Sequence, residues 1–331
     1  MKALAEITID DFVSEKNIHF PNLTLTYEVF GHSLNTKPVV LVVHALTGNS
    51  TVSGEKGWWN QVVGNQKVID TDKFSVIAFN IPGNGYGGKS NSFLEDYKSL
   101  TARDVAVLFH LALQKLSVKQ LFAAIGGSVG GGIIWELAAH APTFVKNLIP
   151  IAADWKATDW LLANTQIQDF ILNHSSHPIE DARIHAMTLY RTPQSFRQKF
   201  NRTVNENLGI HNVESWLLHH GEKLKNRFTL QAYKALNYQL SSIDITRGRA
   251  CFETVVRPIQ SHIHIISVDT DLFFTPDENR KTFTCLNKLH KSVYYHQIQS
   301  IHGHDAFLIE NNQLNKILGE IFVQEETLAS M

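Results

Sequence analysis

The sequence predicts a doubly wound α/β fold, in which a mostly parallel sheet is interrupted by a helical lid. Six strand-length segments are rich in apolar residues and end in loops: 38–44, 74–79, 121–125, 146–152, 262–268 and 292–298. Helical patterns follow several of them, as expected where helical crossovers join parallel strands. Strand-like segments are missing between residues 154 and 245, where helices with polar faces take over. We therefore assign residues 1–153 and 246–331 to a core and residues 154–245 to a lid inserted into it.

Local patterns indicate the elements around these segments. Residues 5–30 have the character of antiparallel strands, and residues 23–30 alternate apolar and polar side chains at the period of a half-buried strand. The segment at 38–44 is apolar almost throughout, which is typical of a parallel strand covered on both faces. Thr101 precedes a helix whose apolar residues recur at helical spacing as far as Leu116. Further helices are predicted at two later places, 278–289 and 314–323.

Composition and charge argue against several classes of function. The 331 residues include 30 Lys and Arg against 31 Asp and Glu, with no basic stripe that would favour nucleic acid. The residues after Met1 turn polar at once, unlike a signal peptide, and no apolar run reaches the roughly 18 residues of a membrane span. Cys251 and Cys285 lack metal or redox spacing. We expect a cytoplasmic protein with no metal, no permanently bound cofactor, and no nucleic-acid or membrane partner.

A glycine-rich segment between a strand and a helix carries the strongest chemical signal. Gly126-x-Ser128-x-Gly130 fits a nucleophile elbow, where a serine sits on a sharp strand-to-helix turn with its hydroxyl exposed above the sheet. Larger residues than glycine would collide where the strand and the helix nearly touch. The N-terminus of the following helix also favours negative charge that develops beside Ser128. The segment therefore predicts Ser128 as a nucleophile.

Polar residues follow the last two strand-like segments in the order that a serine nucleophile requires. Asp269 and Asp271 come after the fifth segment named above, and His302 and His304 come after the sixth. An α/β-hydrolase has its triad in the chain order Ser, acid, His. The serine needs an imidazole base, and the imidazole needs a carboxylate that fixes its tautomer. The order alone leaves open which aspartate and which histidine act with Ser128.

The tetrahedral intermediate of an acyl transfer also needs two N–H donors for its oxyanion. In this fold, one comes from the residue after the nucleophile and the other from a loop that follows an earlier strand. We therefore predict an oxyanion hole formed by the backbone N–H groups of Val129 and Leu46.

Motifs spread along the chain together resemble one family. They are His44-Ala-Leu-Thr-Gly48, Gly57-Trp-Trp59, Val68-Ile-Asp70-Thr-Asp-Lys-Phe74, Thr101-x-Arg103-Asp104, Gly126-Gly-Ser-x-Gly-Gly131, Asp271-Leu-Phe273 and Gly303-His-Asp-Ala-Phe-Leu308. These motifs resemble those of homoserine O-acetyltransferase, an α/β-hydrolase-fold acyltransferase of methionine biosynthesis. The resemblance covers nearly the whole chain.

The resemblance implies an acyl transfer in two steps. Matched by motif, the acid is Asp271 and the base is His304. Ser128 would take an acetyl group from acetyl-CoA, a co-substrate, and pass it to the hydroxyl of L-homoserine or a similar hydroxy amino acid. Arg183 matches the family's lid arginine that holds the substrate carboxylate, and Asp305 matches its residue for the substrate amine. Family members are commonly dimers through their lids, which makes a homodimer an expectation here too.

Three departures from the family pattern leave the substrate open. Val129 replaces a methionine, Gly83–Ser90 lacks a Thr-Gly-Pro tripeptide, and Asp154-Trp-Lys156 replaces small, serine-rich residues. We expect all three near the acyl and acceptor pocket. They are compatible with another acyl donor such as a succinyl thioester, with another acceptor such as serine, or with water. The alternative function is therefore a serine hydrolase for small esters or thioesters, and a third is a catalytically silent binding protein of the same fold.

Overall fold

The computed structural model describes residues 4–88 and 93–328. Its centre is a sheet in the order β1-β2-β6-β3-β7-β8-β11-β12. The strands are β1 (Ala5–Val13), β2 (His19–Gly31), β3 (Val39–Val43), β6 (Ser75–Phe79), β7 (Leu121–Gly127), β8 (Val145–Ile151), β11 (His262–Val268) and β12 (Val293–Ile298). β1 and β2 pair antiparallel, as does β2 with β6, and the strands from β6 to β12 pair parallel. The predicted central strands and the antiparallel start are therefore confirmed.

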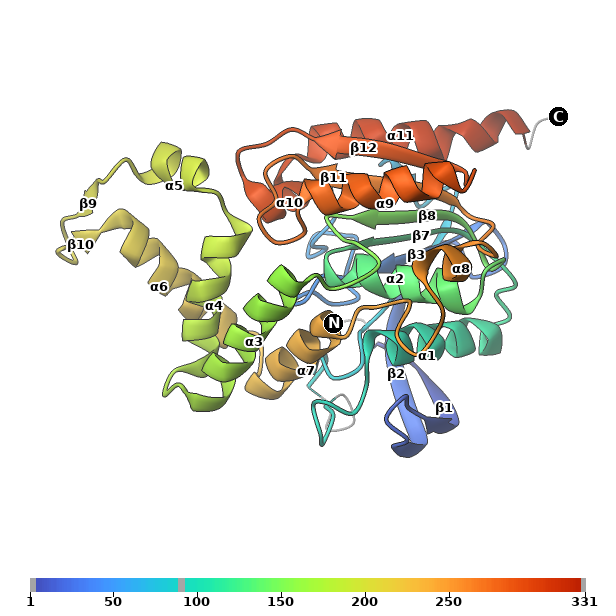
Figure 1. Ribbon diagram of the computed structural model, residues 1–331, viewed down its shortest axis with the longest axis horizontal. Coiled ribbons are helices and arrows are strands. Elements are labelled where there is room, and N and C mark those ends of the chain that lie inside the picture. Colours follow the sequence, from blue (N-terminus) through green and yellow to red (C-terminus); the bar gives the residue numbers. More distant parts are fainter. Residues whose placement is uncertain (1–3, 89–92, 329–331) are drawn as a thin grey trace.

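Helices cover both faces of the sheet (Figure 1). α1 (Ala102–Lys115), α2 (Val129–His140), α8 (Phe252–Val256) and α9 (Pro276–Lys288) pack on one face, and α11 (Asn311–Leu328) packs on the other. Leu41 of β3 belongs to the first of these cores, and its neighbours Val40 and Val42 belong to the second. Since successive side chains of a strand point to opposite faces, a strand buried on both faces must be apolar throughout.

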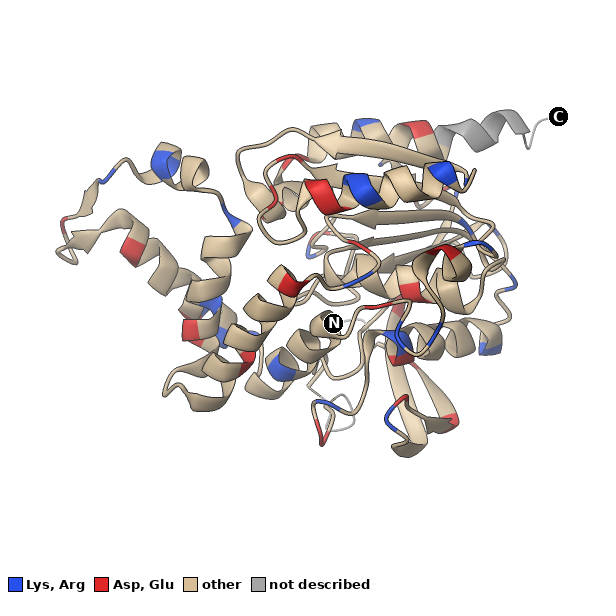
Figure 2. Ribbon diagram, viewed as in Figure 1, with Lys and Arg blue, Asp and Glu red and all other residues tan. Residues whose placement is uncertain are grey.

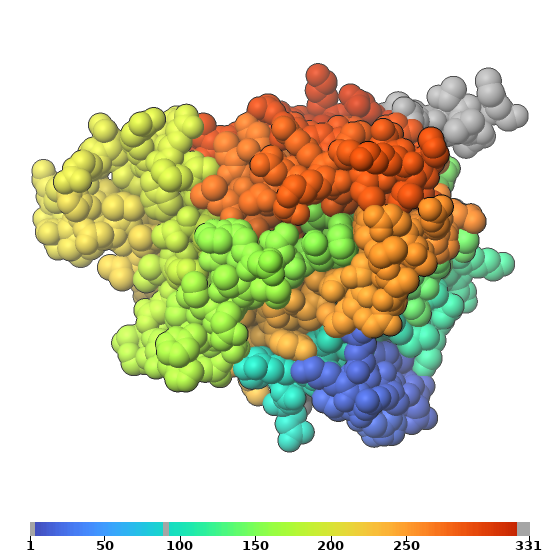
Figure 3. Space-filling model, viewed as in Figure 1, coloured from blue at the N-terminus to red at the C-terminus, as the bar shows by residue number. Residues whose placement is uncertain are grey.

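The segment between β8 and α8 contains five helices. They are α3 (Asp159–His174), α4 (Pro178–Tyr190), α5 (Pro193–Phe200), α6 (Asn212–Lys225) and α7 (Leu230–Ser241), with a small ladder between β9 (Val204–Asn205) and β10 (Ile210–His211). α3, α4 and α7 lie beside the core, while α5, α6 and the small ladder project away from it (Figures 1 and 3). These helices occupy the stretch that we predicted as a lid.

The remaining elements are short. β4 (Val63–Gly64) and β5 (Ile69–Asp70) pair in the loop between β3 and β6, and α10 (Ala306–Ile309) precedes α11. Acidic and basic residues are interspersed in both the sheet region and the lid helices (Figure 2). Within the described ranges, none of the helices combines the length and the apolar character needed to cross a bilayer.

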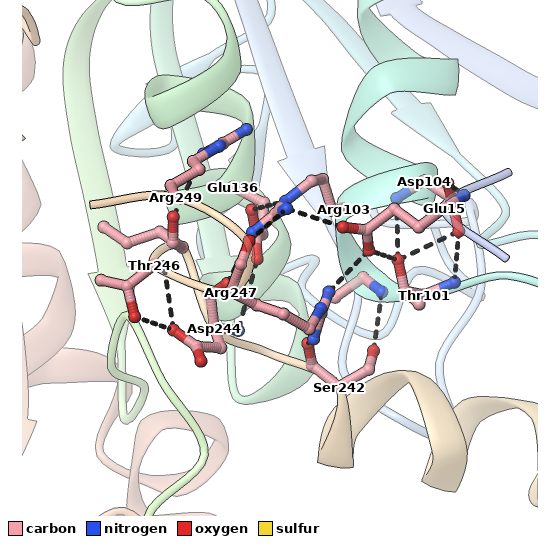
Figure 4. A network of polar contacts seen from close by, with 12 residues as sticks. Glu15, Thr101, Arg103, Asp104, Glu136, Ser242, Asp244, Thr246, Arg247 and Arg249 are labelled. Carbon is pink, nitrogen blue, oxygen red and sulfur yellow. Dashed lines mark hydrogen bonds and ion pairs between the residues drawn. The ribbon is translucent and has the colours of Figure 1, made fainter. Parts of the chain in front are cut away.

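A partly buried ionic network fixes the chain where it returns from the lid to the core (Figure 4). Arg103 of α1 contacts the carboxylate of Glu136, which is fully buried in α2, at 3.0 Å. The same guanidinium donates to the backbone carbonyls of Asp244 and Arg247, each at 2.8 Å, and pairs with Glu15 at 2.6 Å. One arginine therefore connects the loop after β1, the two helices beside the nucleophile segment and the returning chain.

Candidate active site

Ser128 lies on the turn between β7 and α2 in a backbone conformation that favours glycine. Its φ is 56° and its ψ is −125°. A Cβ on Gly126 would come within 2.5 Å of the backbone of Gly130, and one on Gly130 would collide with the carbonyl oxygen of Val43. A strained serine with glycines on either side is the arrangement of a nucleophile elbow, because the close approach holds the serine in place.

Three side chains from distant parts of the sequence meet at this turn. His304, in the 3-10 turn Gly303–Asp305 after β12, has its Nε2 3.0 Å from the Oγ of Ser128. Its Nδ1 lies 2.8 Å from the Oδ2 of Asp271, which follows β11. Ser128, Asp271 and His304 are only 4%, 2% and 3% exposed. The three side chains predicted as nucleophile, acid and base thus form one hydrogen-bonded chain, the geometry of a serine nucleophile with its base.

The carboxylate of Asp271 is oriented by two backbone N–H groups of the turn that follows it. Its Oδ1 accepts hydrogen bonds from the backbone N–H groups of Phe273 and Phe274, at 2.7 and 3.0 Å. Its other oxygen is therefore left to face His304. Burial opposes the charged form of His304, but the charge of Asp271 and its hydrogen bond outweigh burial, and Asp305 adds to them, so the pKa of His304 is raised above its ordinary value.

Four aromatic rings surround the imidazole of His304. The ring centroids of Tyr190, Phe273, Phe274 and Phe307 lie between 5.2 and 5.8 Å from it. Such an apolar surround strengthens the interaction between the imidazole and the carboxylate, because it lowers the local dielectric constant. The sequence did not mark these four rings as part of the site, although Phe273 and Phe307 each belong to one of the family-like motifs.

The two backbone amides predicted for an oxyanion hole belong to the start of α2 and to the loop after β3. Val129 is the first residue of α2, so its N–H has no partner within the helix. Leu46 lies in the loop after β3. The end of β3 runs close to Gly130, since a Cβ on Gly130 would lie 2.4 Å from the carbonyl oxygen of Val43. Neither amide donates a hydrogen bond to any residue that the structure describes. Both N–H groups are thus left without an acceptor among the described residues.

Arg183 is positioned by the helix that carries Tyr190. The two residues are seven apart on α4 and so share a helix face, and the guanidinium of Arg183 lies 5.6 Å from the ring centroid of Tyr190. That ring packs against His304 at 5.4 Å. Among the described residues, Arg183 has no hydrogen bond and no ion pair. An arginine fork without an anionic partner therefore lies one ring away from the histidine.

Asp305 is partly engaged by the lid. Its Oδ2 contacts the Nε of Arg191 at 3.0 Å, and its Oδ1 accepts no hydrogen bond in the described part of the chain. Sequence reasoning missed Arg191, and it also missed Arg227, which donates to the carbonyl of Thr47 at 2.8 Å. Neither arginine lies in a motif, so only the folded chain brings them to the site.

The two residues that remained as alternatives contact other groups. Asp269 accepts a hydrogen bond from the N–H of Ser300 at 2.9 Å, which fixes the start of the histidine loop. The Nδ1 of His302 lies 3.0 Å from the Oγ of Ser195 in α5. Asp269 and His302 therefore shape the loop around His304 and do not join the chain of hydrogen bonds to Ser128.

One of the three departures does not line the site as expected. Asp154 is buried against α9, where it accepts from Thr282 at 2.9 Å and from Asn279 at 3.2 Å, and burial raises its pKa to about 6. Trp155 stacks on Phe252 of α8 at 4.4 Å. The expectation that this segment lines the substrate pocket is wrong for Asp154, whose buried carboxylate is held by α9, while Trp155 is half-buried against α8.

The other two departures are Val129, which lies in the core, and Gly83–Ser90, which contacts the loop after β3. The side chain of Val129 is fully buried in the core. In Gly83–Ser90, Asn84 contacts His44 and Tyr86 contacts Thr51, so this part of the segment packs against the loop after β3. Residues 89 and 90 of that segment are outside the described residues.

Comparison with known proteins agrees with this geometry. Residues 38–246 match the family described as alpha/beta hydrolase fold, so the chain belongs to that class. It is 31% identical to the homoserine O-acetyltransferase of Cyclobacterium marinum, over 94% of this chain and 92% of the relative. It is 30% identical to that of Salinibacter ruber, over 94% and 95%. The chain is therefore a member of the homoserine O-acetyltransferase family of enzymes.

Solved structures show the same fold. The homoserine O-acetyltransferase of Bacillus anthracis superposes with a TM-score of 0.87 at 18% identity, covering 97% of each chain. Esterase E22 superposes with a TM-score of 0.86 at 17% identity, covering 97% of this chain and 99% of the other. At these identities the likeness establishes the α/β-hydrolase fold and leaves the reaction to the side chains of this chain.

Proposed function

We propose that the protein transfers an acetyl group from acetyl-CoA to the hydroxyl of L-homoserine through an acyl-enzyme on Ser128. Its family membership supports this proposal, as does the hydrogen-bonded chain from Asp271 through His304 to Ser128. The observation that favours transfer over hydrolysis is that the guanidinium of Arg183 has no ion pair among the described residues, since an esterase has no need of a carboxylate clamp.

In the first half-reaction, the Oγ of Ser128 attacks the thioester carbonyl while its proton passes to the Nε2 of His304. The carbonyl oxygen becomes an oxyanion, which accepts hydrogen bonds from the N–H groups of Leu46 and Val129. The carbon–sulfur bond then breaks, and the leaving thiolate takes the proton from His304. The acetyl group is left as an ester on Ser128.

In the second half-reaction, the homoserine hydroxyl replaces the thiol. His304 takes its proton as the oxygen attacks the acetyl ester, and the same two N–H groups hold the second oxyanion. The bond to Ser128 breaks, and the proton returns from His304 to the Oγ of Ser128. One base thus serves both halves, which predicts ping-pong kinetics.

The acceptor needs partners for its carboxylate and its amine. The fork of Arg183 suits a carboxylate through two parallel hydrogen bonds. The Oδ1 of Asp305, which accepts no hydrogen bond from any described residue, suits an ammonium group, and the contact with Arg191 fixes the orientation of that carboxylate. Arg183 is separated from His304 by the Tyr190 ring, and Asp305 directly follows His304 in the chain, so we expect a bound acceptor to present its hydroxyl to the base.

The proposal is tested by incubating the protein with acetyl-CoA and L-homoserine and measuring O-acetylhomoserine and free thiol. We expect both products in equal amounts and parallel lines in double-reciprocal plots. Thiol release at the same rate without any amino acid would establish the hydrolase instead. A product only with a succinyl thioester or only with serine would change the donor or the acceptor while leaving the acyl-enzyme in place.

The carboxylate clamp is tested separately with Arg183→Ala. Loss of a charged, bidentate contact costs about 1.5–3 kcal/mol, so the KM for homoserine should rise about 10- to 100-fold. The KM for acetyl-CoA should stay within about threefold. Arg197→Ala, which removes an exposed lid arginine of α5, is the matched control and should change neither KM. Equal effects of Arg183→Ala on both substrates would remove Arg183 from the acceptor site.

We further propose a cytoplasmic homodimer that forms through the lid. Support comes from apolar side chains that the projecting part of the lid exposes, among them Val204, Leu208 and Leu218 at 51%, 61% and 56% exposure. Single exposed apolar residues are ordinary, whereas several on the same projecting part of the lid favour an interface. Sedimentation velocity of the wild type and of Leu208→Asp tests this, and a monomeric wild type would refute it.

A further inference from the structure

His44 is a buried histidine to which the proposed mechanism gives no part. It directly follows β3, it is 1% exposed, and it begins the loop that carries Leu46. Most buried polar groups are hydrogen-bonded, so the partners of the two ring nitrogens of His44 show which protonation state it has.

Each nitrogen of His44 has a partner that allows only one direction of hydrogen bonding. Nδ1 lies 2.7 Å from the carbonyl oxygen of Ala45, which can only accept. Nε2 lies 3.0 Å from the backbone N–H of Ile81, which can only donate. The ring is therefore the neutral tautomer with its proton on Nδ1. Burial lowers the pKa of His44 to about 4, against the hydrogen bond to Ala45, so this form persists at neutral pH.

The hydrogen bond from Nδ1 determines the direction of the next peptide group. The Ala45 oxygen accepts from His44 and also from the N–H of Gly48 at 2.8 Å. In a trans peptide, the C=O of one residue and the N–H of the next lie in one plane and point in opposite directions. Two donors that hold the Ala45 carbonyl thus also aim the N–H of Leu46 away from them.

Two asparagines hold the other side of the ring. The Nδ2 of Asn84 lies 3.2 Å from the Nε2 of His44 and 3.2 Å from the Oδ1 of Asn80. That Oδ1 also accepts from the N–H of Ser50 at 2.9 Å. The network connects both ends of the loop to the chain after β6, so the imidazole cannot rotate without breaking several buried hydrogen bonds.

We propose that His44 is a positioning residue, whose Nδ1–H holds the Ala45–Leu46 peptide so that the Leu46 N–H faces the oxyanion formed at Ser128. This inference rests on the acyl-enzyme in the proposed function. Its effect is confined to states that carry an oxyanion, because an uncharged ester carbonyl gains much less from a fixed donor than the tetrahedral intermediate does.

Two substitutions separate the two nitrogens. In His44→Asn, the side-chain amide N–H reaches the place of Nδ1, so the donor to Ala45 is kept and the acceptor for Ile81 is lost. In His44→Gln, the longer side chain supplies an acceptor in the place of Nε2, and the donor to Ala45 is lost. Both variants remove the ring, so a difference between them reports which hydrogen bond matters.

The rate of the p-nitrophenol burst from p-nitrophenyl acetate measures acylation of Ser128 independently of any acceptor. We expect His44→Gln to slow the burst about 10- to 100-fold, somewhat less than the loss of an oxyanion donor itself, and His44→Asn to stay within about threefold. Trifluoroacetone, whose hemiketal with serine carries an oxyanion, should bind His44→Gln more weakly by the same factor. A KM for p-nitrophenyl acetate that stays within about twofold separates this from a general disturbance of the site.

The matched control is His264→Phe, since His264 is also a buried histidine of a central strand whose pKa burial lowers to about 4. It should keep the wild-type burst. An equal loss in both His44 variants, or no loss in His44→Gln, overturns the proposal. If His44→Gln does not fold, the ¹⁵N spectrum of wild-type histidines decides, because an Nε2–H tautomer at His44 also overturns it.

The outcome also separates this inference from the function on which it rests. A wild type that is acylated but does not transfer acetyl to homoserine refutes the proposed function. The burst rates of the two His44 variants still test the role of His44 in that case, because they need no acceptor. A wild type that forms no acyl-enzyme from either ester refutes both.

Discussion

Asp271→Asn tests the hydrogen-bonded chain most directly, because the geometry dictates how the new amide must lie. The oxygen of the asparagine has to take the place of Oδ1, which faces the N–H groups of Phe273 and Phe274 at 2.7 and 3.0 Å. The NH₂ group then faces the Nδ1 of His304, which must become an acceptor. The imidazole proton moves to Nε2, 3.0 Å from Ser128, so this nitrogen can no longer accept the serine proton.

The magnitude follows from the tautomer. A base held in the wrong tautomer lowers kcat about 10⁴-fold in serine enzymes, which corresponds to about 5.5 kcal/mol of activation free energy. Burst kinetics with p-nitrophenyl acetate and steady-state transfer to homoserine should both show this loss. The unfolding midpoint should change little, since the amide keeps the shape of the carboxylate.

Asp269→Asn is the matched control, because its Oδ1 accepts from Ser300 and the carboxylate does not face His304. We expect its kcat to stay within about threefold of the wild type. A fall of less than tenfold for Asp271→Asn, or an equal fall for both variants, would refute the assignment of Asp271 as the acid partner of His304.

Three further predictions concern pH, stability and backbone packing. The pKa of His304 is raised above its ordinary value of 6.5, and only the neutral ring accepts a proton, so the acid limb of kcat/KM should have its midpoint above pH 6.5. A midpoint at or below 6.5 in a pH–rate profile would contradict this. Arg103→Met leaves Glu136 buried without its partner and should lower the free energy of unfolding by about 3–5 kcal/mol in urea titrations, where a loss under 1 kcal/mol would contradict it. Gly130→Ala places a methyl group against the Val43 carbonyl and should lower stability by at least about 1–3 kcal/mol and slow acylation, so a variant with wild-type unfolding and burst would refute the close packing.

The central strands and the nucleophile turn could be predicted from the sequence because their signals are local. A strand covered on both faces must be apolar at every position, and a tight strand-to-helix turn needs glycine at fixed places, so both leave short patterns in the chain. The helix after Thr101 was predictable for the same reason, since Thr101 and Asp104 form a capping box within one turn.

The surroundings of the site could not be predicted in the same way. Asp154 and Trp155 follow a strand at the expected edge of the sheet, yet α8 and α9 pack over them, and both helices lie more than 90 residues later in the chain. Arg191 and Arg227 carry no local signal, and each meets its partner across a large separation in sequence.

Asp269 and Asp271 show where local information ends. Both are aspartates after the same strand, so strand-end placement alone does not distinguish them, and the family-like motif favoured Asp271. In the folded chain, the N–H groups of Phe273 and Phe274 turn Asp271 toward His304, while Asp269 accepts a hydrogen bond from the N–H of Ser300. The sequence determines the residue types, their order and the local turn that orients Asp271. Which aspartate meets His304 was decided only by the tertiary structure, because the partners of Asp271 and Asp269 lie 33 and 31 residues further along the chain.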